Sequence, residues 1–137
     1  MNIAPITIPA VGRRISRPDV SRMESHIEVV ETAYEFMLAY AAQGREDDLE
    51  GPGRKSREVL TELEEALSSI SEALDRTEPF SEVVSDDIGK TRKALALVLA
   101  QPRISSELVD NLNASMHLRA VLTDLFLVSE AARISSA

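Results

Sequence analysis

Apolar residues recur every three or four positions along most of this chain, which is the spacing that places them on one side of an α-helix. The first such segment runs from about residue 19 to Gly44, and Ser16 or Asp19 can cap its start. Its apolar positions are Val20, Met23, Ile27, Val30, Tyr34, Met37 and Ala41, with a second row at Val29, Ala33, Phe36 and Tyr40. The glutamates at positions 24, 28, 31 and 35 fall on the opposite side. The pattern predicts a long helix that is apolar over about half of its circumference.

The segment from about residue 54 to residue 77 carries the most regular repeat in the chain. Its apolar positions are Leu60, Leu63, Leu67, Ile70 and Leu74, spaced as in the seam of a helix bundle. Before it, residues 45–54 read REDDLEGPGR, and their glycines and proline predict a loop. The acidic residues of this loop lack the alternating ligand pattern of an EF-hand, so calcium binding is not predicted.

Two further helices are predicted after Pro79, which cannot continue a helix. One spans about residues 81–100, and the other begins at Ser105 or Ser106 and continues without a break to about Arg133. The apolar side of this last helix consists of Leu118, Val121, Leu125, Val128 and Ala132, with Leu122 and Phe126 beside them. Helices joined by such short connections pack in an up-and-down order.

The predicted fold is therefore all-α, with an antiparallel four-helix bundle formed by residues 19–137 and preceded by an extended N-terminal arm. The arm, residues 1–18, contains three prolines, and its isoleucines show no helical spacing. A chain terminus of this composition is expected to be extended or disordered by itself.

The first and last predicted helices carry more apolar surface than one neighbour can cover. Met116, Leu127 and Val109 form a thin second stripe away from the main apolar side of the last helix. Phe36 and Tyr40 widen the apolar side of the first helix. Because exposed apolar stripes are typical of contact surfaces, these five residues are the predicted interface, either with a protein partner or in a homodimer.

Charge and composition narrow the functions open to such a bundle. The formal net charge is −8, and an acidic surface repels a phosphate backbone, so nucleic acid is not an expected partner. The chain has no cysteine, which excludes thiolate chemistry. No apolar run approaches the roughly 20 residues that a membrane span needs. We expect a cytoplasmic protein that does not bind membranes.

The two histidines are the main candidates for chemistry. His26 falls between the two apolar rows of the first helix, which predicts a buried, neutral imidazole with a hydrogen-bond partner. His117 lies at the margin of the apolar side of the last helix, aligned with Asn113 and Asp124, where solvent can reach it. Neither histidine has a glutamate three positions before it, as the ligand motif of di-metal bundles requires. No metal, cofactor or catalytic residue is predicted.

The sequence favours a non-enzymatic protein–protein interaction module, such as an adaptor, a regulator, a chaperone-like protein or an assembly factor. It would act through its apolar helix faces. Two alternatives stay open. One is a histidine phosphotransfer module in which His117 accepts the phosphoryl group. The other is a small helical enzyme or ligand-binding protein with a pocket near His26, Tyr34 and Tyr40.

Overall fold

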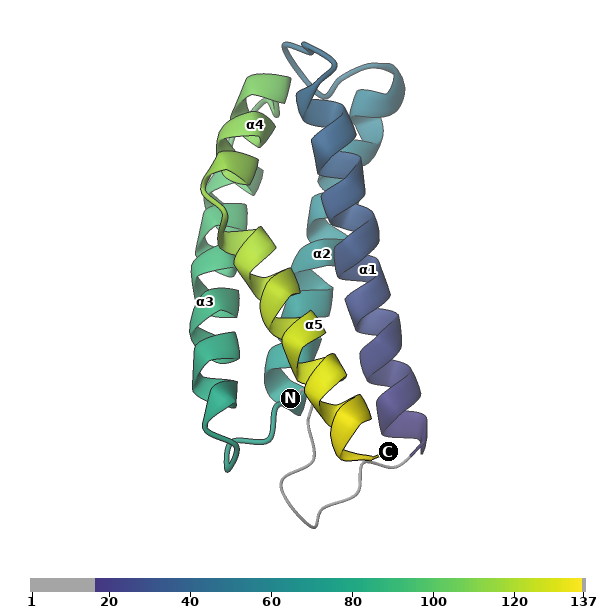
Figure 1. The fold of residues 1–137 in the computed structure, drawn as a ribbon. Helices are drawn as coiled ribbons and strands as arrows, with labels where there is room; N and C mark the ends of the chain where they lie inside the picture. The colour runs from purple at the N-terminus through teal and green to yellow at the C-terminus, as the bar shows by residue number, and fades with distance from the viewer. Residues whose placement is uncertain (1–16, 137) are drawn as a thin grey trace.

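Five α-helices pack together in the computed structural model, which describes residues 17–136 (Figure 1). They are α1 (Arg17–Ala41), α2 (Arg54–Ala73), α3 (Phe80–Leu99), α4 (Ser106–Ala114) and α5 (His117–Ser135), and a short 3-10 helix (Gly51–Gly53) precedes α2. The described part of the chain contains no strand, so the all-α class is confirmed. Residues 1–16 of the predicted arm lie outside the described residues, and α1 already includes residues 17 and 18.

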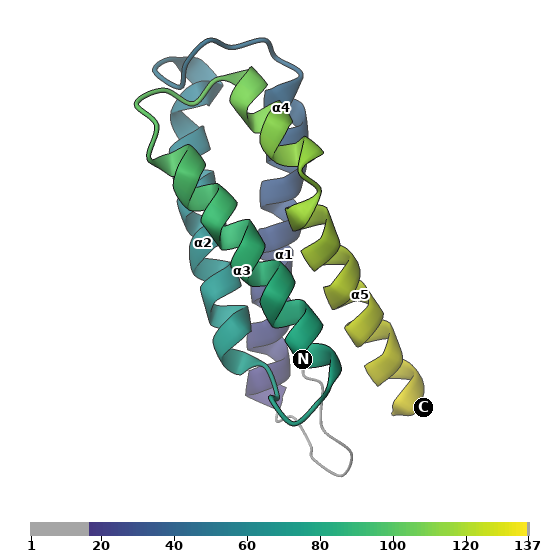
Figure 2. The same cartoon turned by 90° about the vertical axis from the view of Figure 1, so that its left-hand side faces the viewer.

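The helices α1, α2 and α3 alternate in direction along the long axis of the bundle, and α4 and α5 both run in the direction opposite to α3 (Figure 1). α1 packs against α2 and α4, α2 packs against α3, and α3 packs against α5. Figure 2 shows that α4 and α5 together return along the bundle, with a change of direction between them. The bundle is therefore closed by two consecutive helices where the sequence predicted one.

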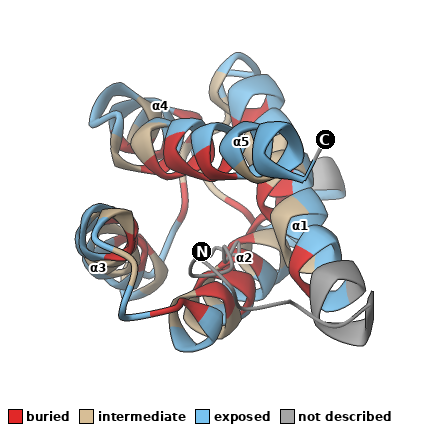
Figure 3. Ribbon diagram, turned by 60° about the horizontal axis from the view of Figure 1, so that its bottom comes forward, coloured by how far each residue is buried: buried red, intermediate tan, exposed pale blue. Residues whose placement is uncertain are grey.

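Leucine and isoleucine side chains of α2 form the centre of the core. Leu60, Leu63, Leu67 and Ile70 are each at most 1% exposed, which confirms the seam predicted from their spacing. α2 packs against α1 and α3, and its seam belongs to one buried cluster that also includes residues of the other helices: Val30, Met37, Val84, Ile88, Leu95, Val109, Leu118, Val121 and Leu125. Figure 3 shows buried positions, in red, mostly on the sides of the helices that face one another, and exposed positions, in pale blue, on their outer sides.

The predicted fourth helix is interrupted at Met116, whose φ of 66° and ψ of 2° are left-handed. The Ser115 hydroxyl donates to the Leu112 carbonyl oxygen (2.6 Å), and the Asn113 side-chain amide donates to the Met37 carbonyl oxygen of α1 (3.2 Å). Serine and asparagine form such bonds at the expense of helix continuation. The prediction of one unbroken helix was wrong because these competing bonds leave no trace in the apolar spacing.

One helix end differs from the prediction and another agrees with it. α2 ends at Ala73 rather than near residue 77, because the Asp75 carboxylate accepts hydrogen bonds from the Thr77 amide (3.0 Å) and hydroxyl (2.6 Å) and holds a turn. The start of α4 agrees with the prediction, since the Ser105 hydroxyl caps it by accepting a bond from the Leu108 amide (3.0 Å).

A buried carboxylate joins the loop after α1 to the loop before α4. Asp48 is 8% exposed, and it accepts hydrogen bonds from the Ile104 amide (2.9 Å) and from the Arg57 guanidinium (2.8 Å). Arg57 also donates to the carbonyl oxygens of Leu99 (3.0 Å) and Gln101 (2.6 Å). We refer to Asp48, Arg57 and these partners as the loop clamp.

Further bonds at the same end of the bundle involve α1 and the start of α4. The Tyr40 hydroxyl donates to the Ile104 carbonyl oxygen (2.6 Å), and the Ser106 hydroxyl donates to the Tyr40 carbonyl oxygen (2.6 Å). The backbones of Arg45 and Ser106 also meet, with a 2.8 Å bond from the Ser106 amide to the Arg45 carbonyl oxygen. The predicted loop, residues 45–54, is thus hydrogen-bonded to the rest of the bundle at several positions.

Replacement of Asp48 by asparagine is expected to lower the free energy of unfolding by about 2 kcal/mol at pH 7, because a charge-assisted bond to Arg57 is lost. Burial tends to raise the pKa of Asp48, but the bonds from Ile104 and Arg57 outweigh burial and hold this pKa below its usual value of 3.8. The stabilisation is therefore present above about pH 4 and is lost as the pH falls below that value.

Urea denaturation of the wild type and Asp48→Asn between pH 3 and pH 7 measures this difference. Glu46→Gln is the matched control, because Glu46 is an exposed acid of the same loop. Equal losses of stability in the two variants would contradict the role assigned to Asp48.

Candidate interaction surface

The helix α5 is apolar on two opposite sides. Leu118, Val121, Leu125 and Val128 are at most 4% exposed and face the core. Large apolar side chains nevertheless remain exposed on its other side. They are Phe126 (49%), Leu127 (56%) and Ile134 (63%), with Met116 (51%) at the residue before the helix. We call these four residues the outer stripe.

Helical geometry explains why one helix has both kinds of side. Leu127 and Ile134 are seven residues apart and therefore share a side, while Leu118 and Leu125 lie roughly on the opposite side at about 100° per residue. Since α5 packs against α3 and α1 with its inner side, its outer side meets no other described helix (Figure 3). From Met116 to Ile134 the outer stripe extends along about 27 Å of helix at 1.5 Å per residue.

The charges beside the outer stripe are mixed. Arg119, Glu130 and Arg133 are exposed there, and Glu130 forms an ion pair with Arg133. The hydrogen bond from Arg133 lowers the pKa of Glu130, so this carboxyl stays ionised at neutral pH. By contrast, the exposed sides of α1 and α2 are strongly acidic. Their exposed glutamates include Glu24, Glu28, Glu35, Glu58, Glu62 and Glu65.

The five residues predicted as an interface are not on one surface. Met116 and Leu127 are exposed, whereas Val109 and Tyr40 are each 1% exposed and belong to the core. Phe36 is half-buried and stacks on Tyr40, with ring centroids 5.9 Å apart. Val109 would share a side with Met116 in an unbroken helix. Because the chain breaks at Met116, α4 packs against α1 in its own orientation, and Val109 is buried. Val109 and Tyr40 are therefore not available to a partner.

Phe126 and Ile134 are the surface residues that the sequence interpretation missed. Phe126 was assigned to the inner side with Leu122, but the structure buries Leu122 (6%) and leaves Phe126 exposed. Ile134 could have been found from the sequence, because it lies one heptad after Leu127.

Both histidines are half-buried. Burial, followed by the positive charge of Arg22, lowers the pKa of His26, so its neutral form is favoured. The predicted full burial of His26 is not found, because α1 is covered less completely around His26 than further along the helix. His117 is the first residue of α5. The break at Met116 separates it from the helical register of Asn113, so the predicted alignment with Asn113 does not form.

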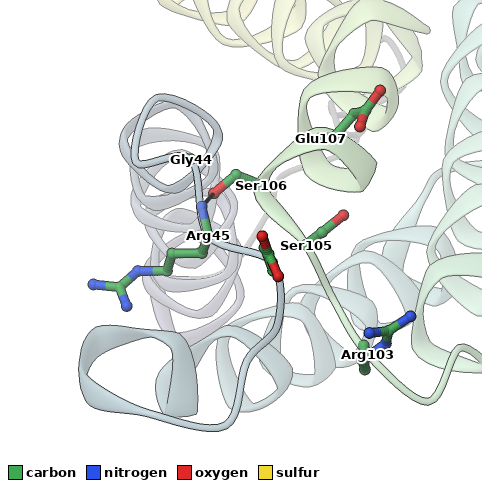
Figure 4. Close-up of a pocket in the computed structure, with 7 residues that line it drawn as sticks. Gly44, Arg45, Arg103, Ser105, Ser106 and Glu107 are labelled. Atoms are coloured by element: carbon green, nitrogen blue, oxygen red, sulfur yellow. Dashed lines mark hydrogen bonds between the residues drawn. The ribbon is translucent and has the colours of Figure 1, made fainter.

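A hollow of about 460 Å³ lies between the loop after α1 and the start of α4 (Figure 4). It is lined by Gly44, Arg45, Glu46, Arg103, Ser105, Ser106 and Glu107. Arg45 and Arg103 point away from each other in Figure 4. The positive charges of the two arginines are balanced by the negative charges of Glu46 and Glu107, so the hollow favours neither an anion nor a cation.

Two further features, a metal site and a membrane span, are not found among the described residues. Within residues 17–136, no three side chains of histidine, aspartate or glutamate are grouped so that they could hold a metal ion. In the same range, no helix is both long enough and apolar enough to cross a membrane.

Comparison of the chain with protein-family models, with curated proteins and with solved structures finds no match. A function for this bundle therefore has to be inferred from its own surface and interior.

The left-handed backbone at Met116 predicts a preference for glycine at this position. Met116→Gly and Met116→Ala both remove the side chain, but only glycine adopts positive φ without a steric cost. After allowance for the greater freedom of glycine in the unfolded chain, we expect the glycine variant to be the more stable by about 0.5–1 kcal/mol. Thermal or urea unfolding measures the difference, and an alanine variant of equal or greater stability would argue against this backbone conformation.

Proposed function

We propose that the protein is a non-enzymatic interaction module that associates through the outer stripe of α5. The observation that carries this proposal is the presence of apolar residues on both sides of one helix, of which the bundle covers only the inner side. Three large apolar side chains of α5, together with Met116 just before it, remain about half exposed or more, which is unusual for a surface that stays in water. Cover for these side chains would have to come from outside the described helices, and we propose that another polypeptide provides it.

A second copy of the chain is the partner that we propose, because the outer side of α5 is a surface on which the charges permit it. Two copies with a net charge of −8 each repel one another, most strongly where the exposed glutamates of α1 and α2 would face each other. The outer side of α5 has two positive residues, Arg119 and Arg133, and one negative residue, Glu130. The outer sides of two α5 helices can therefore approach each other without this repulsion.

An antiparallel arrangement of two α5 helices also fits the order of these charges. It would bring the Arg119 end of each helix toward the Glu130 end of the other, in the symmetric manner of a two-fold dimer. Phe126 and Leu127 would then lie near the centre of the contact, where apolar side chains contribute most to binding.

Leu127→Glu is expected to dissociate such a dimer. Burial of a leucine side chain contributes about 1.5–3 kcal/mol, and a buried unpaired carboxylate adds a further cost, so the dissociation constant should rise by about 100-fold or more. Sedimentation equilibrium over a range of concentrations measures this change, and circular dichroism verifies that the variant is folded.

Leu97→Glu is the matched control, because Leu97 is a comparably exposed leucine (66%) on α3. This variant should remain as dimeric as the wild type. A wild type that is monomeric at all concentrations, or equal dissociation in the two variants, would overturn the proposed association through α5.

A further inference from the structure

Two carboxyl groups meet in the contact between α3 and α5. Asp124 of α5 is 9% exposed, and Asp87 of α3 is half-buried. Their side chains lie within hydrogen-bonding reach of each other. The Oδ2 atom of Asp124 is enclosed and has no hydrogen-bond partner among the described residues. A buried polar atom of this kind requires a chemical explanation.

A proton shared by the two carboxyl groups provides that explanation. Ionised carboxylates only accept hydrogen bonds, so two of them in contact repel, whereas a protonated carboxyl can donate to an ionised one. Burial raises the pKa of Asp124, and the hydrogen bond and negative charge of Asp87 raise it further, to about 8.

Within the described residues, no cation offsets the negative charge at this contact. On α3, Lys90 pairs with Asp86 (3.2 Å) and both are exposed, while Arg92 bonds to Glu64 of α2 (2.6 Å). Asp87 is the charged group that shifts the pKa of Asp124.

The described parts of the other helices near α5 contribute no neutralising charge either. On α1, the half-buried His26 has Arg22 as the charged group that shifts its pKa. On α4, Asp110 is exposed. On α5 itself, His117 lies seven residues before Asp124, about 10 Å away along the helix, which is too far for an ion pair. Loss of the shared proton would therefore leave two negative charges in contact, one of them buried, with no nearby partner.

We propose that Asp87 and Asp124 form a proton-controlled latch that holds α5 against α3 while the two groups share a proton and loosens this contact when the proton leaves to solvent. Loosening would expose core residues on the inner side of α5, such as Val121 and Leu125. Met116, at which the chain changes direction, is the point about which α5 would move relative to α4. The latch is independent of the proposed dimer, because it acts on the inner side of α5 and not on the outer stripe.

The sign of the pH dependence follows from linkage. Asp124 has a higher pKa in the folded protein than its ordinary value of 3.8, so the stabilisation is complete below about pH 4 and is lost as the pH rises through about 8. Within this range the equilibrium constant for opening rises by up to about tenfold per pH unit. Because His26 has its pKa lowered from 6.5, it contributes the opposite trend only at lower pH. The interval from pH 6.5 to pH 9 therefore isolates the latch.

Hydrogen exchange of the full chain tests the latch, with rates corrected for the intrinsic effect of pH. In the wild type, the protection of α5 amides should fall between pH 6.5 and pH 9, while α2 amides should change less. Asp124→Asn keeps the shape of a protonated aspartate and carries no ionisable group, so α5 should stay protected throughout this range. Asp86→Asn is the matched control on α3 and should behave as the wild type.

Carbon-13 NMR of the aspartate carboxyl groups provides a second measurement that does not depend on a variant. One aspartate should titrate far above pH 6, and its signal should be missing in Asp124→Asn. Wild-type protection of α5 that is independent of pH, pH dependence that persists in Asp124→Asn, or titration of every aspartate below pH 5 would each overturn the proposal.

Discussion

A buried carboxylate has to be hydrogen-bonded or paired with a cation, and Asp48 meets this requirement by joining two loops that are far apart in the sequence. Its bonds to Arg57 and Ile104 hold the loop after α1 against the loop before α4. The direction in which α2 leaves one loop and α4 leaves the other is thereby restricted. The leucine seam of α2 packs against α1 and α3 within one core cluster to which all five helices contribute, so the core depends on the loop clamp as well as on apolar burial.

The two polar contacts in the interior of the bundle differ in how fully they are satisfied. In the loop clamp, both carboxylate oxygens of Asp48 accept hydrogen bonds, and Arg57 supplies the opposite charge. In the contact between α3 and α5, Asp124 faces another acid, and one of its oxygens has no partner among the described residues. The loop clamp therefore holds its end of the bundle while Asp48 is ionised, above about pH 4, whereas the proposed contact between α3 and α5 requires a proton.

The regular pattern of α2 shows what can be predicted from sequence with the least ambiguity. Its leucines recur on one side only, so burial of that side is the single possible outcome, and the structure agrees. The last predicted helix has apolar residues on two sides, and periodicity alone does not say which of them the bundle covers. Val109 and Phe126 were misplaced for this reason, since the break at Met116 sets α4 and α5 at different rotations.

The sequence by itself determined that most of residues 17–136 form helices, where most of these helices begin and end, and that one of them has apolar residues to spare. These are local properties, because the spacing of apolar residues and the capping side chains act within a few turns of the chain. The tertiary structure alone decided that Asp48 meets Ile104, that Asp124 meets Asp87, and that Leu127 rather than Val109 stays exposed. Such contacts depend on how helices cross and rotate against each other, and residues distant in the sequence carry no sign of it in their spacing.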